Sequence, residues 1–183
     1  KISLSKSFFP FWRYQFLIKS LNKKIKPYKI NREILGVGNV VFALCYSKEE
    51  KKFYLIKQFR PFYYVRKEKY KFELVGGLVD KTETITQALK REIMEEIGVK
   101  TLKLKKLTKY CPVPGYSDEI VHVFYAEVEK IKNSHLYNKF ENEEIKVSKL
   151  TLNQLKKINS SEQIQNVLTK VSIYEYLNKI KKN

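Results

Sequence analysis

The 183-residue sequence has little of what disulfide frameworks and sulfur- or imidazole-based metal sites require. It contains two cysteines, Cys45 and Cys111, which are too far apart to form a CxxC motif. Its two histidines, His122 and His135, are isolated from each other and from both cysteines. These residues therefore argue against a zinc or redox centre, and they favour two reduced thiols in a cytoplasmic protein.

Long apolar runs are also missing. No stretch of the sequence has the length of a membrane-spanning helix. The aromatic stretch 8–18 is broken by Pro10, Arg13 and Gln15, so it does not resemble a signal peptide. We expect no membrane partner. The stretch 8–18 is better interpreted as a strand or a dimer contact than as an interfacial anchor, although the anchor stays an alternative.

Negative charge is scarce, with 19 acidic against 37 basic residues and a net charge of +18. The lysines are scattered through every segment, a distribution that suits solubility and attracts anions in general. Because an arginine stripe and an aromatic RNA-binding platform are both missing, we expect no specific nucleic-acid partner. The length and the 43% hydrophobic share fit one globular domain with a sizeable core.

Hydrophobic periodicity and turn residues predict an α/β fold. Strands are expected at 40–46, 53–60, 72–75, 102–107 and 120–128, and helices at 84–97 and 151–158. A last helix is expected from Ser160, where Ser160-x-x-Gln163 has capping-box spacing. Its apolar face would consist of Ile164, Val167, Leu168, Val171 and Leu177. Residues 1–36 are expected to form an N-terminal strand extension, and residues 37–183 the main domain.

The helix expected at 84–97 carries acidic residues where a plain amphipathic helix has apolar ones. The stripe that should face the core consists of four residues at helical spacing: Ile85, Leu89, Ile93 and Ile97. Glu96 falls inside this stripe, Glu92 lies within about 20° of Ile85, and Glu95 is next to both glutamates. Three neighbouring carboxylates repel one another and are costly at half-buried positions, and a divalent cation removes both penalties. Oxygen ligands favour Mg²⁺ or Mn²⁺, and this interpretation outweighs an ordinary solvated acidic face.

The loop before this helix supports the metal site. Gly76 and Gly77 allow the backbone to approach a ligand closely, with a carbonyl free to face the metal. Glu83 precedes the helix, where its charge suits the helix dipole. Arg91 could pair with Glu83 and hold the loop against the helix. An ordinary surface ion pair is an equally good interpretation of these two residues.

These residues together resemble the signature of the Nudix hydrolase family, in which Gly and Glu precede an Arg-Glu-aliphatic-x-Glu-Glu-x-Gly-aliphatic run. The matching residues, without a departure, are Gly77, Glu83, Arg91, Glu92, Ile93, Glu95, Glu96, Gly98 and Val99. The resemblance implies an α/β/α sandwich with a mixed sheet and Mg²⁺-dependent hydrolysis of a pyrophosphate bond, with Mn²⁺ as a substitute. It implies metal ligation by Gly76, Glu92, Glu95 and Glu96, a catalytic role for Glu96, and structural roles for Gly77, Glu83, Arg91 and Gly98.

Residues outside the signature resemble the group of ADP-ribose pyrophosphatases. Pro114 lies 15 residues beyond Val99, and the runs 114–119 and 59–61 are similar to segments of that group. The run 77–81 looks like the related UDP-sugar pyrophosphatases. By this resemblance Arg60 contacts phosphates or the terminal sugar, and Glu73 and Glu119 contact its hydroxyls. The group also implies a homodimer that exchanges N-terminal strands.

The general base is implied to lie on a loop after the signature. In this sequence the acidic loop 140–145 occupies that region, with Glu141, Glu143 and Glu144. A carboxylate on a loop can come within hydrogen-bond reach of a water once substrate is bound. We expect Glu143 or Glu144 to be the base, with a merely solvated acidic loop as the alternative.

The leading functional hypothesis is therefore hydrolysis of a nucleoside diphosphate sugar, either ADP-ribose or a UDP- or ADP-sugar, to a nucleoside monophosphate and a sugar phosphate. A second hypothesis, motivated by the basic surface, is removal of pyrophosphate from RNA 5′ ends or dinucleoside polyphosphates. A third is a catalytically idle domain that senses a ligand. The complete set of signature glutamates argues against the third hypothesis.

Overall fold

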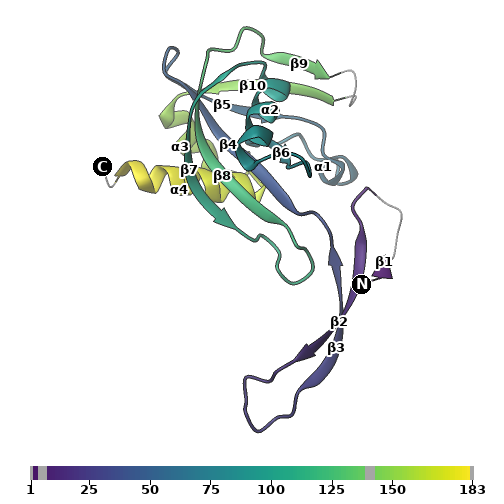
Figure 1. The fold of residues 1–183 in the computed structure, drawn as a ribbon. Helices are drawn as coiled ribbons and strands as arrows, with labels where there is room; N and C mark the ends of the chain where they lie inside the picture. The colour runs from purple at the N-terminus through teal and green to yellow at the C-terminus, as the bar shows by residue number, and fades with distance from the viewer. Residues whose placement is uncertain (1, 4–7, 139–142, 182–183) are drawn as a thin grey trace.

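The computed structural model describes residues 2–3, 8–138 and 143–181, which form two β-sheets and four helices (Figure 1). The smaller sheet contains three antiparallel strands, β1 (Ile2–Ser3), β2 (Phe11–Ile18) and β3 (Tyr28–Leu35). The larger sheet has the order β7 (Thr101–Tyr110), β8 (Ile120–Val128), β4 (Asn39–Ser47), β5 (Lys52–Lys57), β10 (Glu143–Leu150) and β9 (His135–Asn138), and β6 (Val75–Leu78) also pairs with β4.

The larger sheet is mixed, because β4 runs parallel to β8 and antiparallel to β5 and β6. One edge of β4 is shared between two partners. Its first half pairs with β6, where Val41 faces Gly77 and Phe42 faces Gly76, and its last three residues pair with β5. The glycines of the signature are thereby held in the sheet, next to the end of β5. The expected α/β fold with a mixed sheet is confirmed.

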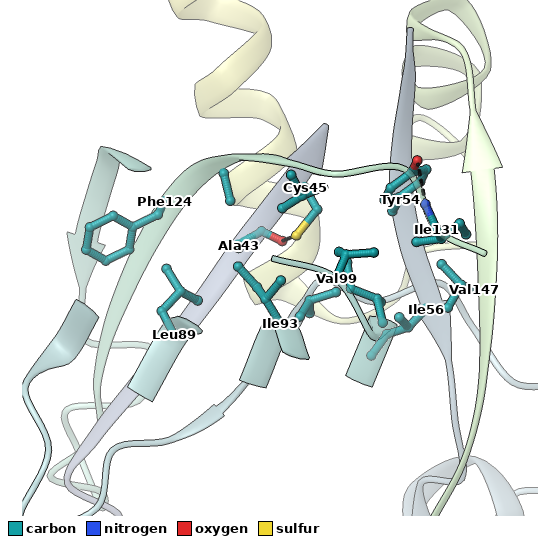
Figure 2. Packing of buried hydrophobic residues seen from close by; sticks show 14 of the residues in the cluster. Ala43, Cys45, Tyr54, Ile56, Leu89, Ile93, Val99, Phe124, Ile131 and Val147 are labelled. Carbon is teal, nitrogen blue, oxygen red and sulfur yellow. Dashed lines mark hydrogen bonds between the residues drawn. The ribbon is translucent and has the colours of Figure 1, made fainter. Parts of the chain in front are cut away.

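Hydrophobic residues of β4 and β5 alternate between two cores, one on each face of the sheet. On one face, α2 (Ile85–Ile97) packs its buried residues against the sheet (Figure 2), including Leu89 and Ile93 against Ala43, Cys45, Tyr54 and Ile56. On the other face, α3 (Leu152–Asn159) and α4 (Val167–Lys181) cover Phe42, Leu44, Phe53 and Leu55. The sheet therefore lies between two helical layers.

Helices α2 and α3 begin where the sequence predicts. Thr84 caps α2 in a capping box with Gln87, and Thr151 caps α3 in the same way with Gln154. Helix α2 ends at Gly98, whose φ of 67° lies in the left-handed region that favours glycine. A short helix, α1 (Pro61–Val65), follows β5 and was not predicted; Arg60 precedes its first residue.

The predicted start of the last helix is wrong. Ser160 ends α3, and α4 begins only at Val167, where the side chain of Asn166 accepts hydrogen bonds from two backbone amides of the first turn. The predicted apolar face is also partly wrong, since Val167 and Val171 are exposed. Two polar residues, Thr169 and Ser172, are buried instead of them. The Thr169 hydroxyl accepts a hydrogen bond from the amide of Leu74, and the Ser172 hydroxyl donates one to the carbonyl of Leu168. Both hydroxyls are therefore buried with a hydrogen-bond partner.

Two predictions about strands need correction. The strand expected at 72–75 is β6, which begins at Val75 and runs through both glycines because they fit against β4. The acidic segment expected as a loop contains the start of β10: Glu143 and Glu144 pair with Asn138 and Tyr137 of β9. The alternation of buried Ile145 and Val147 with exposed Lys146 is the period-two pattern of a strand. Glu141 lies outside the described residues.

The N-terminal strands form an arm that projects from the main body (Figure 1). Strands β2 and β3 pair over eight residues each, and the tip of the arm exposes Leu17 and Leu21. At its base, one carboxylate oxygen of Asp118 accepts hydrogen bonds from the amides of Val37 (2.7 Å) and Gly38 (2.9 Å). Within the described residues, no helix is both long and apolar enough to cross a membrane.

Candidate active site

Helix α2 carries Glu96 into the interior, where the structure places it among core residues. The side chain is only 6% exposed, close to buried Ile93 and Ile97 of the same helix. Its Oε2 accepts a hydrogen bond from the backbone amide of Gly76 (2.8 Å), and its Oε1 one from Nε2 of Gln58 (3.4 Å). Burial, and to a smaller extent the charge of Glu96, raises the pKa of the Cys45 thiol, so Cys45 is a structural residue and not a nucleophile.

The two glycines of β6 bring the backbone against the acidic side chains. Gly76 has a φ of +153°, and a β-carbon there would collide with the carbonyl of Val41 and lie 2.8 Å from the α-carbon of Phe42. A β-carbon on Gly77 would lie 2.7 Å from the carboxylate carbon of Glu92. Only glycine at position 76 therefore allows the strand to lie against β4, and the missing β-carbon at position 77 leaves room for the Glu92 carboxylate.

Arg91 holds three of the acidic residues together. Its Nε and Nη2 donate to the two carboxylate oxygens of Glu83 (2.9 and 3.0 Å), and Nη2 also donates to the carbonyl of Leu78 (3.1 Å). Its Nη1 is shared between Glu92 (2.8 Å) and Glu95 (2.9 Å). The hydrogen bonds to Glu83 are the main reason why the pKa of Arg91 lies well above, and that of Glu83 below, the usual value. The predicted pairing of Arg91 with Glu83 is thus present.

A cavity of about 620 Å³ opens beside these residues. Its walls combine cationic, acidic, glycine and aromatic residues: Phe8, Phe9, Gln58, Arg60, Gly76, Gly77, Leu78, Asp80, Arg91, Glu92 and Glu96. This volume lies within the range of small-molecule sites, and a wall with both signs of charge can bind a phosphate together with a cation.

Arg60 is fixed at the edge of this cavity by a buried carboxylate. Its Nη2 and Nε both donate to Oε2 of Glu73, at 2.8 and 2.9 Å. Glu73 is 3% exposed and is not part of the cavity wall, whereas the Arg60 side chain is 37% exposed. Glu73 therefore orients Arg60 in this structure.

Other predicted site residues are not gathered around the cavity. Glu95 is exposed, and it contacts Arg91 without being part of the cavity wall. Glu119 also lies outside the wall, just before β8, and burial raises the pKa of its carboxyl group. Glu144 is exposed on β10, two residues before Lys146, which pairs with Lys57 of β5. Among the described residues, no three His, Cys, Asp or Glu side chains converge closely enough to hold a metal ion by themselves.

The structure adds cavity residues that the sequence analysis missed. Gln58 is buried beside Glu96, and a period-two pattern through Tyr54 and Ile56 could have revealed that it faces the same side of the sheet. Phe8 and Phe9 have no local signal, because only the path of the N-terminal arm brings them to the cavity. Their rings make an edge-to-face contact with centroids 4.8 Å apart.

Comparison with known proteins gives a consistent result. A family model described as NUDIX domain matches residues 37–170. An ADP-ribose pyrophosphatase of Bacillus subtilis (strain 168) is 34% identical over 149 residues, which are 80% of this chain and 75% of that protein. A GDP-mannose pyrophosphatase of Citrobacter koseri is 30% identical over 125 residues, and the chain spans 65% of its length.

A solved structure described as an ADP compounds hydrolase shares the fold. It superposes with a TM-score of 0.71 over 99% of this chain and 91% of its own, at 15% sequence identity. At this identity the likeness concerns the arrangement of the elements alone.

Proposed function

The chain belongs to the NUDIX family, and from this membership we propose that it is a pyrophosphatase of nucleoside diphosphate sugars, with ADP-ribose as the first substrate to test. The observation that carries the proposal is that one cavity brings together Arg60, the carboxylates of Glu92 and Glu96, and two aromatic rings. A nucleoside diphosphate sugar presents an anionic pyrophosphate flanked by a base and a sugar. The name of the Bacillus subtilis relative, ADP-ribose pyrophosphatase, supports the choice of substrate.

We propose Mg²⁺ as the cofactor, with Mn²⁺ as a substitute. Carboxylate oxygens are the ligands that hard divalent cations prefer, and Glu96 offers them from a buried position in the cavity wall. Glu92 and Glu96 of the cavity wall, with the carbonyl of Gly76, would hold the ion, and Glu95 would join them by exchanging its contact with Arg91 for the ion. A bound divalent ion supplies polarised phosphoryl oxygens, an activated water and a neutralised leaving phosphate.

The chain's own residues have distinct tasks in this proposal. Arg60, oriented by Glu73 at the edge of the cavity, presents its guanidinium to a phosphate group. Arg91 reduces the repulsion between Glu92 and Glu95 by donating to both carboxylates. It also links them to the loop that carries Glu83. Phe8 and Phe9 provide apolar surface for the nucleobase. Glu119 remains a proposed contact for a sugar hydroxyl.

Glu143 or Glu144 is the proposed general base that accepts a proton from the attacking water. Glu144 precedes Lys146 on β10 by two residues. Because β10 and β5 are antiparallel and Lys146 pairs with Lys57, Glu144 lies toward the end of β5 that is followed by Gln58. A comparison of Glu143→Gln and Glu144→Gln with Glu129→Gln, an exposed residue just after β8, tests this role. If all three variants keep the pH profile of the unmodified protein, the base lies elsewhere.

We further propose a homodimer in which the N-terminal extension, residues 1–36, contacts a second copy through the arm of strands β2 and β3. The exposed Leu17 (68%) and Tyr28 (48%) on the paired strands offer apolar surface for such a contact. A cytoplasmic location is proposed from the free thiol of the exposed Cys111. Sedimentation of the whole chain, with and without Leu17→Asp, measures the oligomeric state.

The test of the function is a substrate panel with Mg²⁺ and products identified by mass. We expect ADP-ribose to yield AMP and ribose 5-phosphate, and the same panel includes UDP- and GDP-sugars and triphosphorylated RNA. Turnover confined to RNA would replace the proposal with the RNA 5′-end activity. No turnover of any compound, with confirmed folding and with Mg²⁺ or Mn²⁺, would falsify the enzymatic proposal.

A further inference from the structure

A second, smaller cavity lies on the sheet face opposite α2. It is open to solvent, has a volume of about 300 Å³ and is lined by Lys57, Lys69, Tyr70, Lys71, Glu162 and Gln163. The segment before β6 contributes three of these residues, and the connection between α3 and α4 contributes two. The backbone of Phe72 joins the two segments by donating to the carbonyl of Gln163 (2.9 Å). We call this cavity the lysine pocket.

Lys57 is in an unfavourable position for a cation. Its direct cross-strand neighbour on β10 is Lys146. Like charges at directly opposite positions destabilise the pairing of two antiparallel strands. The Lys57 side chain is half-buried, with its ammonium 4.1 Å from the centre of the Phe72 ring. Burial, followed by the charges of Lys146 and Lys71, lowers the pKa of Lys57. Among the described residues, no carboxylate lies within ion-pair distance of either Lys57 or Lys146.

The acidic residues of this region do not balance its positive charge. Glu68 forms an ion pair with Lys71 (3.4 Å), and Glu162 is an exposed residue of the pocket wall. The pocket wall therefore contains three lysines and one glutamate, with Lys146 and Glu68 next to it as partners of Lys57 and Lys71. The hydroxyl of Tyr70 and the side-chain amide of Gln163 add neutral donors to the wall.

We propose that the lysine pocket binds a phosphate dianion, either inorganic phosphate or a small phosphate monoester. A dianion would match the excess of positive charge, accept hydrogen bonds from ammonium, hydroxyl and amide donors, and relieve the repulsion between Lys57 and Lys146. The pocket has about half the volume of the cavity beside α2, which favours a compact anion over a whole nucleoside diphosphate sugar. The site is separate from the catalytic cavity and does not depend on the proposed function.

The first experiment is thermal unfolding of the full chain during titration with inorganic phosphate, compared with sodium chloride at equal ionic strength. At a hundredfold excess over the dissociation constant, we expect a rise in Tm on the order of 5 °C beyond the effect of the salt. Lys57→Met keeps an unbranched chain over Phe72 and removes the charge, so this rise should disappear. Lys103 is an exposed lysine on β7, the edge strand at the end of the sheet opposite β9. Lys103→Met is therefore the control and should keep the phosphate-dependent rise in Tm.

Two further variants make the result decisive. Arg60→Met removes a cation from the catalytic cavity, and we expect it to retain the phosphate effect. Loss of the effect in Arg60→Met, together with its persistence in Lys57→Met, would assign the anion to the catalytic cavity and overturn the proposal. Lys146→Met, at an exposed position, replaces Lys57→Met if that variant does not fold, and it should weaken phosphate binding several-fold. A phosphate response equal to that of sodium chloride also overturns the proposal.

A third arm distinguishes the source of the phosphate group. Ribose 5-phosphate and inorganic phosphate are titrated into Arg60→Met, where the catalytic cavity contributes least. Equal shifts in Tm support a site that reads the phosphate group alone. A shift with the monoester only assigns the site to sugar phosphates, and no shift with either compound contradicts the proposal.

Discussion

The two faces of the large sheet carry concentrated charge of opposite sign, and they neutralise it differently. On the α2 face, one guanidinium contacts Glu83, Glu92 and Glu95, and a backbone amide contacts Glu96. On the α3 and α4 face, Lys57 has a lysine as its cross-strand neighbour. Acidic groups thus have partners within the chain, whereas the lysine pocket retains an excess of positive charge.

Sequence distance explains this difference. Apart from Gln58, the acidic residues and their partners on the α2 face lie within residues 76–98, so helical spacing and one tight strand bring them together. The lysines come from β5, β10 and the segment before β6, and only the tertiary fold places them side by side. A site with local partners can be preorganised by a short motif. The lysine pocket, assembled from distant segments, is the site for which we propose an external anion as the balancing charge.

The largest expected effect comes from removing the charge of Glu96 alone. Glu96→Gln keeps an oxygen that can accept from the Gly76 amide, so the free energy of unfolding should change by less than about 1 kcal/mol. Turnover of ADP-ribose should fall on the order of a thousandfold, because a charge in the cavity wall is lost. Steady-state kinetics and urea unfolding measure the two quantities, with Glu129→Gln as control. Near-normal activity would remove Glu96 from the catalytic machinery.

The next effect tests the close approach of β6 to β4. Gly76→Ala places a β-carbon against the Val41 carbonyl at a φ of +153°, so we expect destabilisation of at least about 3 kcal/mol. Gly115→Ala is the control, since a β-carbon there meets nothing within 4 Å, and it should change stability by less than about 0.5 kcal/mol. Equal effects of the two substitutions would contradict the tight packing of β6.

Direct comparison of the two faces requires one cation to be changed on each. Arg91→Lys loses the forked hydrogen bonds to Glu83 and should cost about 2 kcal/mol of unfolding free energy. Lys57→Met removes a cation that faces another cation, and in phosphate-free buffer it should leave stability unchanged or raised. Urea unfolding in low salt measures both. If Lys57→Met is as destabilising as Arg91→Lys, the two faces do not differ in the way proposed.

The smallest effect separates stability from activity by means of two equivalent caps. Thr84→Ala and Thr151→Ala each remove a capping box and should each cost about 1 kcal/mol, or roughly 2–4 °C in Tm. Only Thr84 begins the helix that carries the acidic residues, so only Thr84→Ala should also lower turnover, by a few-fold. Equal turnover in the two variants would show that the start of α2 does not influence the site.

Local patterns predicted the elements that carry their own signals. Thr84 with Gln87 and the terminal Gly98 mark the bounds of α2, and the stripe of apolar residues correctly places Glu96 on its core-facing side. The same kind of capping signal at Ser160 was misleading, because its hydroxyl donates to the Lys156 carbonyl and ends α3. A serine with suitable spacing can serve either end of a helix, and the packing of neighbouring elements decides between them.

The remainder of the candidate site depended on contacts between distant segments. The orientation of Arg60 results from burial of Glu73, thirteen residues later, and the aromatic wall results from the path of the N-terminal arm. Neither has a periodic signature. The strand character of Glu144 was missed because its acidic neighbours resemble a solvated loop, although Ile145 and Val147 alternate as in a strand.

The sequence by itself determined the charge balance, the helix of residues 85–97 and the ordered set of glycines and glutamates, because these depend on spacing along one segment. The tertiary structure alone decided which polar and charged groups of distant segments meet. It brought Gln58 to Glu96 and Glu73 to Arg60, and it placed Lys57 opposite Lys146. The physical reason is that side-chain electrostatics act over a few ångströms in space, while pairing of strands joins residues that are far apart in the chain.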